Sequence, residues 1–232
     1  MNRLFLLILT LMLLGCQTQP INPMTGMADK VFELPSYDQR VPSLSLAEIE
    51  KEIKKLNSVI GGYPPKFTST QHRDMTYVTW ANLLQETLAY QTTEDGTEQI
   101  LYLLSELYRQ GHNLDVRHSA ENAKKSIDEC LGVNNHSVPC NFSAVYFYLS
   151  VNPKYADKAE KSLSFLRGHY APKPNHEVER AYVTLYIFKQ DAVAAREQID
   201  YFIQTFPDSP DREIFEKIRS GLDDGEIKKH QI

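Results

Sequence analysis

The amino-acid sequence predicts an all-α fold of about eight or nine helices arranged as antiparallel pairs. Beyond residue 70, apolar residues recur at helical spacing in one segment after another, with short turns between the segments. No segment shows the alternation of apolar and polar residues that is typical of a half-buried strand. A short apolar motif also returns at a fixed interval in the second half of the chain, which is typical of stacked helix pairs.

The first helix is predicted to begin near Ser45. Ser45 and Glu48 have the spacing of a capping box, in which each side chain accepts a hydrogen bond from the other residue's backbone. Apolar residues follow at helical intervals, namely Leu46, Ile49, Ile53 and Leu56. The Gly61-Gly62 and Pro64-Pro65 pairs then end the pattern.

The remaining helices follow from the same apolar spacing. They are predicted over residues 75–90, 98–110, 118–131, 140–150, 154–169, 176–189, 191–205 and 210–220. Asn152-Pro153 and Ser209-Pro210 each combine a capping residue with a proline, which favours the start of a helix directly after them.

A stripe of one small and two larger apolar residues returns every 36 residues. Its three copies are Ala123, Ile127 and Cys130; Ala159, Leu163 and Leu166; and Ala195, Ile199 and Phe202. The small residue lets a neighbouring helix approach closely, and the larger two extend the same stripe. Because one helix pair cannot bury its apolar face alone, the repeat favours neighbours stacked into a solenoid. The alternative is a helical bundle in which this spacing arises by chance.

The last repeat resembles the tetratricopeptide (TPR) pattern. Its matching positions are Tyr182, Tyr186, Ala195, Ile199 and Pro207. Where the family has a glycine and a first-helix tryptophan, this chain has Val183 and Glu179. The resemblance covers residues 96–208 and implies a right-handed solenoid of helix pairs.

In the TPR family, the first helix of each pair lines a concave groove that receives a peptide or a partner helix. Applied to this sequence, the resemblance and the helix phase assign Tyr148, Arg180 and Thr184 to such a groove. The alternative for the tyrosines is packing between helices.

The first sixteen residues form a separate segment. Arg3 precedes an apolar run over residues 4–14, and Gly15 and Cys16 follow it. The run is far shorter than the roughly 20 apolar residues that span a bilayer. The segment resembles a bacterial lipoprotein signal, which implies a signal peptide over residues 1–15 and a lipid on Cys16. In that family the residue after the cysteine guides sorting, and Gln17 implies the outer membrane, with the protein facing the periplasm. The alternative is an ordinary signal or anchor with an incidental cysteine.

Residues 16–43 are predicted to form an extended tether between the lipid and a helical domain over residues 44–232. The segment contains Pro20, Pro23, Pro35 and Pro42 and has no regular apolar period. Part of it has side chains apolar enough to dock on the domain, namely Val31, Phe32, Leu34 and Tyr37.

With Cys16 lipidated, Cys130 and Cys140 remain as a pair in an oxidising compartment. We expect a disulfide that closes the short loop between them. The alternatives are two buried free thiols or, less favoured, a zinc site, which would need further ligands at short spacing.

The composition and motifs argue against several classes of function. The net charge is −5 and no basic block occurs, whereas nucleic-acid binding requires clustered Lys and Arg. The sequence contains no nucleophile elbow, His-Glu-x-x-His motif or phosphate-binding glycine loop. We therefore expect no catalytic residues, no metal site and no cofactor besides the lipid.

The densest polar stretch is residues 111–118, which includes His112, Asp115 and Arg117. These side chains could contact a partner or, less favourably, support metal or acid–base chemistry. The favoured interpretation is a structural turn, because the same residue types cap helices and form turns.

The expected function is that of a protein-binding adaptor or envelope assembly factor, held at the outer membrane by its lipid and facing a protein partner in the cell envelope. One alternative is a protein that binds the cell wall or a small ligand, or a weak hydrolase with an unrecognised pocket. Another is a purely structural envelope protein.

Overall fold

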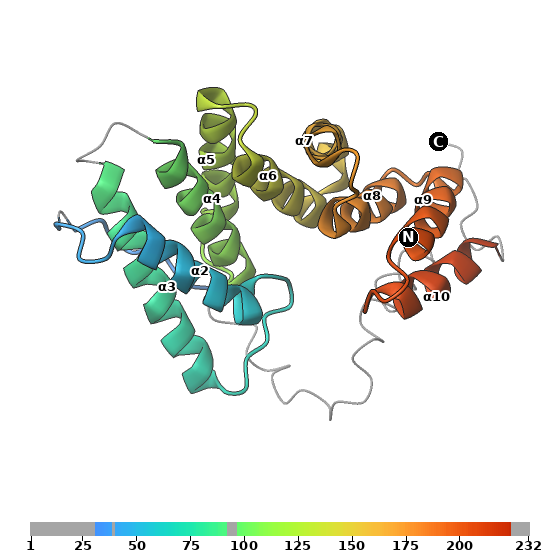
Figure 1. Cartoon of the computed structure of the whole chain (residues 1–232). Coiled ribbons are helices and arrows are strands. Elements are labelled where there is room, and N and C mark those ends of the chain that lie inside the picture. Colours follow the sequence, from blue (N-terminus) through green and yellow to red (C-terminus); the bar gives the residue numbers. More distant parts are fainter. Residues whose placement is uncertain (1–30, 39, 92–96, 224–232) are drawn as a thin grey trace. The chain divides into compact units, whose positions relative to one another are not determined.

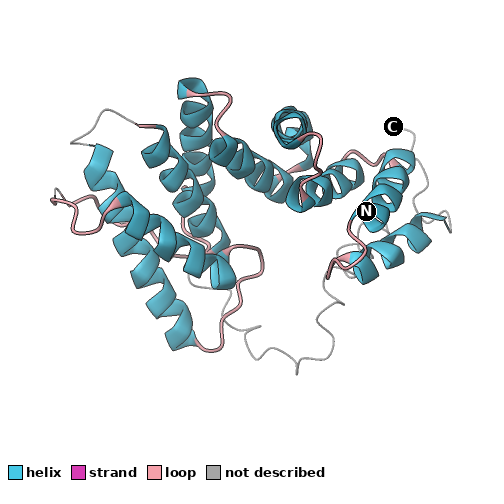
Figure 2. Ribbon diagram, viewed as in Figure 1, coloured by secondary structure: helices cyan, strands magenta, loops and turns pink. Residues whose placement is uncertain are grey.

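The computed structural model describes residues 31–38, 40–91 and 97–223. Over these residues the regular elements are helical and no named strand occurs (Figure 2). They are α2 (Leu46–Ile60), α3 (Thr70–Gln91), α4 (Glu98–Asn113), α5 (Ser119–Val133), α6 (Val138–Val151), the short 3₁₀ helix η2 (Pro153–Tyr155), α7 (Ala156–Tyr170), α8 (His176–Phe188), α9 (Ala192–Thr205) and α10 (Arg212–Asp223). The all-α prediction and the predicted number of helices are confirmed for this part of the chain. The predicted signal peptide and Cys16 lie outside it.

Most helix boundaries agree with the sequence to within two or three residues. The capping box is present, since Ser45 accepts from the backbone N–H of Glu48 and the Glu48 carboxylate accepts from that of Ser45. The largest difference is at α3, which begins at Thr70 rather than at Met75. The hydroxyl of Ser69 accepts a hydrogen bond from the backbone N–H of His72 at 3.0 Å, so a cap lies a full turn earlier than the apolar pattern indicates.

The chain divides into two compact units, with the boundary inside α6 between Phe147 and Tyr148. The helical domain expected over residues 44–232 stays a prediction, and within it the described residues form two units. We call them the N-terminal unit, described here over residues 31–147, and the C-terminal unit, described over residues 148–223. Each is treated separately.

The N-terminal unit is built around α2, α3 and α4, which lie side by side (Figure 1). Trp80 is fully buried in its core, and its indole Nε1 donates a hydrogen bond to the backbone oxygen of Leu107 at 2.7 Å. Gly111 lies against the same indole, and a Cβ on it would come within 2.5 Å of the Trp80 ring. α3 and α4 can approach this closely because residue 111 has no side chain.

A buried polar network joins α4 to the end of α2. Arg109 donates to the carbonyl oxygen of Gly61 at 2.6 Å, and Asn113 donates to that of Ile60 at 2.9 Å. These oxygens lie at the carboxyl end of α2, where no intrahelical donor is available. Arg109 also pairs with the carboxylate of Glu106 at 2.7 Å, and both side chains are only 8% exposed. Burial alone would raise the pKa of Glu106, but Arg109 and the Ser143 hydroxyl hold it below its usual value.

Residues 31–44 pack along α3, and Phe32 is one of the apolar side chains expected to dock there. Phe32 is 5% exposed, and its ring stacks on Tyr77 with the centroids 4.1 Å apart. Further along, the carboxylate of Glu86 accepts from the backbone N–H groups of Ser43 and Leu44. The buried aromatic ring and these hydrogen bonds fasten the segment to the helical unit.

Cys130 of α5 and Cys140 of α6 lie at disulfide distance. Their Cα atoms are 6.0 Å apart, which is within the usual range for a disulfide. Both residues are fully buried. The predicted pairing is confirmed geometrically, and it links the end of α5 to the first turn of α6.

Breaking this disulfide should destabilise the chain without abolishing its helices. The sequence separation is 10 residues, and closing a loop of that size stabilises by about 2–3 kcal/mol in the chain-entropy model. We expect urea denaturation with and without reductant to show this difference. Maleimide labelling of the native protein should modify neither cysteine until reductant is added. A Cys130→Ser, Cys140→Ser double variant provides the background, and ready labelling of the native chain without reductant would contradict the bond.

The C-terminal unit has an aromatic core formed by α8, α9 and α10. Phe202 of α9 is fully buried, with its ring centroid 4.9 Å from that of Phe215 and 5.1 Å from those of His176 and Phe206. α7 packs against α8, and α10 packs against α9. This unit carries two of the three copies of the apolar stripe.

All nine residues of the 36-residue stripe are buried at 1% exposure or less. The copies occupy equivalent positions on α5, α7 and α9, and α4 with α5 and α8 with α9 form neighbouring pairs. The helix phase deduced from the repeat is therefore correct. Stacking of the pairs into one right-handed solenoid stays a prediction.

Candidate functional site

A pocket lies in the C-terminal unit, where the turn between α7 and α8 meets α9. Its volume is about 290 Å³, and its lining is Arg167, Ala171, Pro172, Lys173, Pro174, Asn175, Glu179, Gln198 and Tyr201. We call it the α7–α8 pocket. Serine, threonine, cysteine and histidine are not among these lining residues, so the pocket contains none of the common nucleophile–base pairs.

The turn that forms one wall of the pocket is held by local interactions. The backbone N–H of Lys173 donates to the carbonyl oxygen of Tyr170 at 3.0 Å. Two residues later, the side chain of Asn175 caps α8 by accepting from the N–H groups of Glu177 and Val178. With Pro172 and Pro174 restricting the backbone between them, the turn is shaped by its own sequence.

The floor of the pocket is a charged cluster that joins three helices. Arg167 of α7 binds the carboxylate of Glu179 of α8 with two of its nitrogens, Nε at 3.1 Å and Nη2 at 2.5 Å. Gln198 of α9 accepts from Arg167 at 3.0 Å and donates to Glu179 at 2.9 Å. The Glu179 side chain is 2% exposed, whereas that of Arg167 is 41% exposed. A buried carboxylate thus holds a guanidinium that still reaches the surface.

The Arg167 guanidinium also packs against an aromatic ring. Its Cζ lies 3.5 Å from the ring centroid of Tyr182, a cation–π contact. Its Nη1 has no hydrogen-bond partner within the described part of the chain. Lys173, which is exposed at the rim, forms no ion pair within the same residues. The pocket therefore offers an oriented N–H donor group and an ammonium group to an anionic ligand.

Tyr148, which the TPR resemblance assigned to a groove, is 2% exposed. Its ring packs against Tyr155 with the centroids 5.4 Å apart, and the Lys158 ammonium lies 5.3 Å from the ring centroid. The assignment is wrong for this residue because a side chain covered by its own chain presents no surface. Packing between helices, the alternative, is what the structure shows.

Arg180 and Thr184 lie one turn apart on α8 and are both partly exposed. Arg180 pairs with Glu177 at 2.6 Å, and both side chains are more than 40% exposed. Burial would raise the pKa of Glu177, but Arg180 and His176 lower it overall. Neither Arg180 nor Thr184 lines the α7–α8 pocket, so a groove role for them stays a prediction.

The polar stretch over residues 111–118 lies in the N-terminal unit and behaves as a structural turn. Asp115 and His118 adopt left-handed backbone conformations, and His112 belongs to the last turn of α4. The backbone N–H of Arg117 donates to the carbonyl oxygen of Phe32 at 2.9 Å, and its side chain pairs with Glu33 at 3.2 Å. The turn thus holds the N-terminal segment, which leaves partner contact by His112, Asp115 and Arg117 untested.

A second, wider cavity of about 550 Å³ lies near the start of α7 and the end of α8. Among its lining residues, Lys189 pairs with Asp157 at 3.2 Å, and the side chain of Asp191 caps α9 by accepting from the N–H of Ala194 at 3.0 Å. These charged side chains are therefore already engaged in the fold.

The cluster of Arg167, Glu179 and Gln198 was not predicted from the sequence. One signal was present, because Glu179 stands where the TPR pattern has a tryptophan and lies among buried apolar residues of α8. A charge in such a position requires a buried partner. The identity of that partner could not be deduced, since Gln198 lies 19 residues away and Arg167 12 residues away on other helices.

Two further kinds of feature, a metal site and a membrane-spanning helix, do not occur among the described residues. No group of three or more His, Cys, Asp or Glu side chains there is arranged to hold a metal ion. No helix in the described ranges is long and apolar enough to cross a membrane. No family model matches the chain, and no curated protein or solved structure matches it either.

Proposed function

We propose that this chain is an outer-membrane lipoprotein whose TPR-like helical units act in the periplasm as a protein-binding adaptor or assembly factor. The observation that carries the proposal is the buried stripe shared by α5, α7 and α9. Three helices bury the same three positions at a constant interval, as expected of a repeat scaffold. Such scaffolds present the remaining helix faces and turns for binding.

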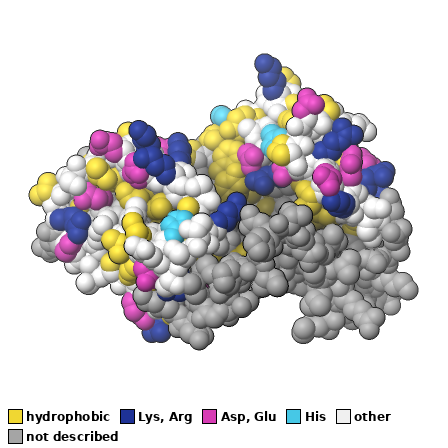
Figure 3. Space-filling model, turned by 90° about the horizontal axis from the view of Figure 1, so that it is seen from below, with side chains coloured by type: hydrophobic (Ala, Val, Ile, Leu, Met, Phe, Trp, Pro, Cys, Tyr) yellow, Lys and Arg dark blue, Asp and Glu magenta, His cyan; other side chains and the backbone are white. Residues whose placement is uncertain are grey.

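The character of the described surface supports a protein partner. On the face shown in Figure 3, Lys and Arg are interspersed with Asp and Glu, with apolar side chains between them. A nucleic-acid site would instead require clustered positive charge. Exposed Tyr201, Tyr63 and Val193 provide apolar contact area of the kind that protein interfaces use.

The lipid on Cys16 would confine the adaptor to the region next to the membrane. The chain between Cys16 and residue 31 can span at most ~50 Å when fully extended. Confinement within that distance raises the effective concentration for a partner in the same envelope layer, so a weak contact would suffice. Several acyl chains would make the attachment effectively permanent.

In-cell photo-crosslinking of the full-length chain tests the adaptor proposal. A photoreactive amino acid would be placed singly at Tyr63, Val193 and Tyr201, which are 71%, 61% and 42% exposed. We expect at least one position to form a discrete adduct with one envelope protein. Adducts with peptidoglycan fragments alone would favour the cell-wall alternative. No adduct at any position would favour the purely structural alternative.

Radiolabelled palmitate incorporation tests the anchor separately. We expect label on the wild-type chain in the outer-membrane fraction and none on a Cys16→Ser variant. Equal labelling of both chains, or recovery of the wild type in the inner membrane, would contradict this part of the proposal.

A further inference from the structure

We propose that the α7–α8 pocket binds the carboxylate of an acidic residue of the protein partner, between the Arg167 guanidinium and the Lys173 ammonium. This inference rests on the proposed function and names the chemistry that the partner presents. Three features of the pocket carry it, namely the arrangement of Arg167, the local charge and the size of the space.

Arg167 is oriented before any ligand arrives. One edge of its guanidinium binds Glu179, one N–H binds Gln198, and the Tyr182 ring lies against its face. The side chain therefore loses little conformational entropy when its remaining nitrogen, Nη1, binds a ligand. A planar guanidinium with its N–H groups fixed in direction is well suited to a carboxylate oxygen.

The charge of the pocket favours a single negative charge. Two cations, Arg167 and Lys173, face one carboxylate, that of Glu179, among the lining residues. One positive charge remains, which a carboxylate neutralises. A doubly charged phosphate would leave an excess negative charge near Glu179, whose side chain is only 2% exposed. Repulsion between like charges is strongest where water is excluded.

The size and the walls of the pocket favour a side chain of a larger molecule. Its volume of about 290 Å³ lies at the lower end of ligand pockets, which usually hold about 300–1,000 Å³. Pro172, Pro174 and Tyr201 provide apolar wall area beside the charged floor. This combination fits an acidic side chain of a partner protein, with the next residue of that partner packed on the ring of Tyr201.

Peptide binding to the purified full chain in detergent tests the inference. The probe is a fluorescent peptide with blocked termini and the central sequence Ala-Tyr-Glu-Ala, and its counterpart carries Gln in place of Glu. A third peptide with the Gln sequence and a free carboxyl terminus distinguishes a terminal carboxylate from a side-chain carboxylate. Fluorescence anisotropy reports the affinities, and inorganic phosphate and acetate serve as competitors.

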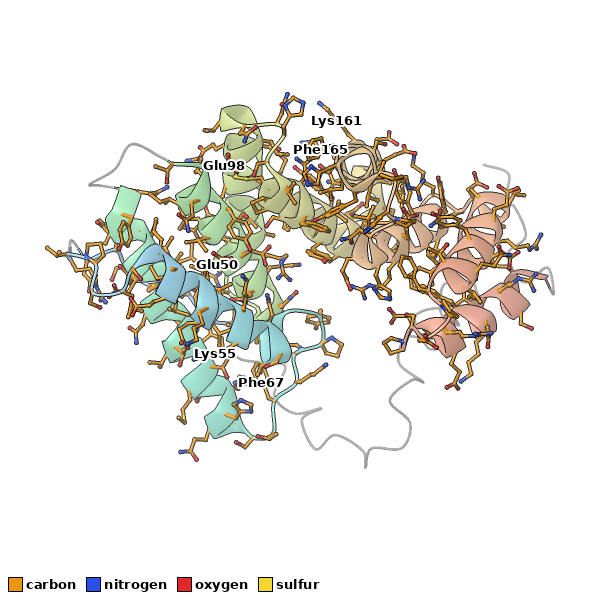
Figure 4. All side chains as sticks on the ribbon, viewed as in Figure 1. Glu50, Lys55, Phe67, Glu98, Lys161 and Phe165 are labelled. Atoms are coloured by element: carbon orange, nitrogen blue, oxygen red, sulfur yellow. A yellow bond between two sulfur atoms is a disulfide. The ribbon has the colours of Figure 1, made fainter. Side chains whose placement is uncertain are left out.

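We expect the Glu peptide to bind at least tenfold more tightly than the blocked Gln peptide. Lys173→Gln should weaken this binding at least fivefold, while Lys173→Arg should retain it. The matched control is Lys161→Gln, an exposed lysine of α7 outside the pocket (Figure 4), which should bind like the wild type. Lys173 is preferred to Arg167 for substitution because its side chain is exposed and supports no buried charge.

Four outcomes would overturn the inference. Two are equal affinity for the blocked Glu and Gln peptides, and equal affinity of Lys173→Gln and Lys161→Gln for the Glu peptide. The third is displacement of the Glu peptide by phosphate at a lower concentration than by acetate. The fourth is stronger binding of the peptide with the free terminus than of the blocked Glu peptide, which would assign the pocket to a terminal carboxylate. The peptides could fail to bind while photo-crosslinking in cells still captures one envelope protein. In that case the adaptor proposal stands and only the assignment of this pocket fails.

Discussion

Replacing Arg109 by methionine is expected to lower the free energy of unfolding by about 3–5 kcal/mol, the usual cost of leaving one partner of a buried ion pair alone. The Glu106 carboxylate would stay buried without its counter-charge, since both side chains are 8% exposed. The carbonyl oxygen of Gly61 and the side-chain oxygen of Asn57 would lose a donor as well. Urea denaturation followed by the fluorescence of Trp80, the single tryptophan, measures the loss within the N-terminal unit.

A surface ion pair provides the matched control. Lys54 pairs with Glu50 at 2.6 Å, but its side chain is 65% exposed, so Lys54→Met should change stability by about 0–1 kcal/mol. Figure 4 labels Glu50 on α2. Equal effects of the Arg109 and Lys54 substitutions would contradict a special role for the buried pair.

The Arg109→Met effect should depend on pH in a defined direction. In the wild type, burial is outweighed by Arg109 and Ser143, which hold the pKa of Glu106 below its usual value. The resulting stabilisation is present above the usual carboxyl pKa of about 4.3 and is lost as the pH falls through the lower value in the folded state. In the variant burial dominates and raises that pKa, so the variant loses stability as the pH rises. The difference between the two chains should therefore be smaller near pH 4 than at pH 7.

The second large effect is expected for Phe202→Ala in the C-terminal unit. Phe202 is fully buried among His176, Phe206 and Phe215, and truncating such a ring usually costs about 3–5 kcal/mol because a cavity remains. Hydrogen exchange measured by mass spectrometry should show faster exchange throughout α8, α9 and α10, since these helices share the core that the ring fills.

Gln204→Ala, two residues along the same helix at an exposed position, is the control and should change stability by at most about 0.5 kcal/mol. Exchange that rises only in the turn of α9 around residue 202 would mean that the three helices do not unfold together.

Local sequence patterns were sufficient to predict most of the helices and the buried stripe. Ser45 with Glu48 marked the start of α2, and the positions equivalent to Ala195, Ile199 and Phe202 are buried in α5 and α7 as well. Capping and apolar spacing act between residues three or four apart, so the sequence displays them directly. The same reasoning placed the start of α3 five residues late, because the first turn of that helix carries few apolar residues to reveal it.

The candidate site depends on contacts that no local pattern contains. Arg167, Glu179 and Gln198 come from three helices, and each appears in the sequence as an ordinary polar residue. Tyr148, by contrast, is of a residue type that is common in recognition surfaces, but its ring is covered by Lys158 and Tyr155. Whether a polar or aromatic side chain faces solvent is decided by what packs on it.

The sequence by itself determined most of the helices and the phase of the repeat, and it favoured the pairing of Cys130 with Cys140, because periodicity, capping and cysteine spacing are properties of the chain itself. The tertiary structure alone decided that Glu86 of α3 binds the backbone of Ser43 and Leu44, that Glu106 and Arg109 form a buried pair, and that a positively charged pocket forms between α7, α8 and α9. These features arise where helices distant in sequence meet, and there the cost of burying a charge makes its partner obligatory.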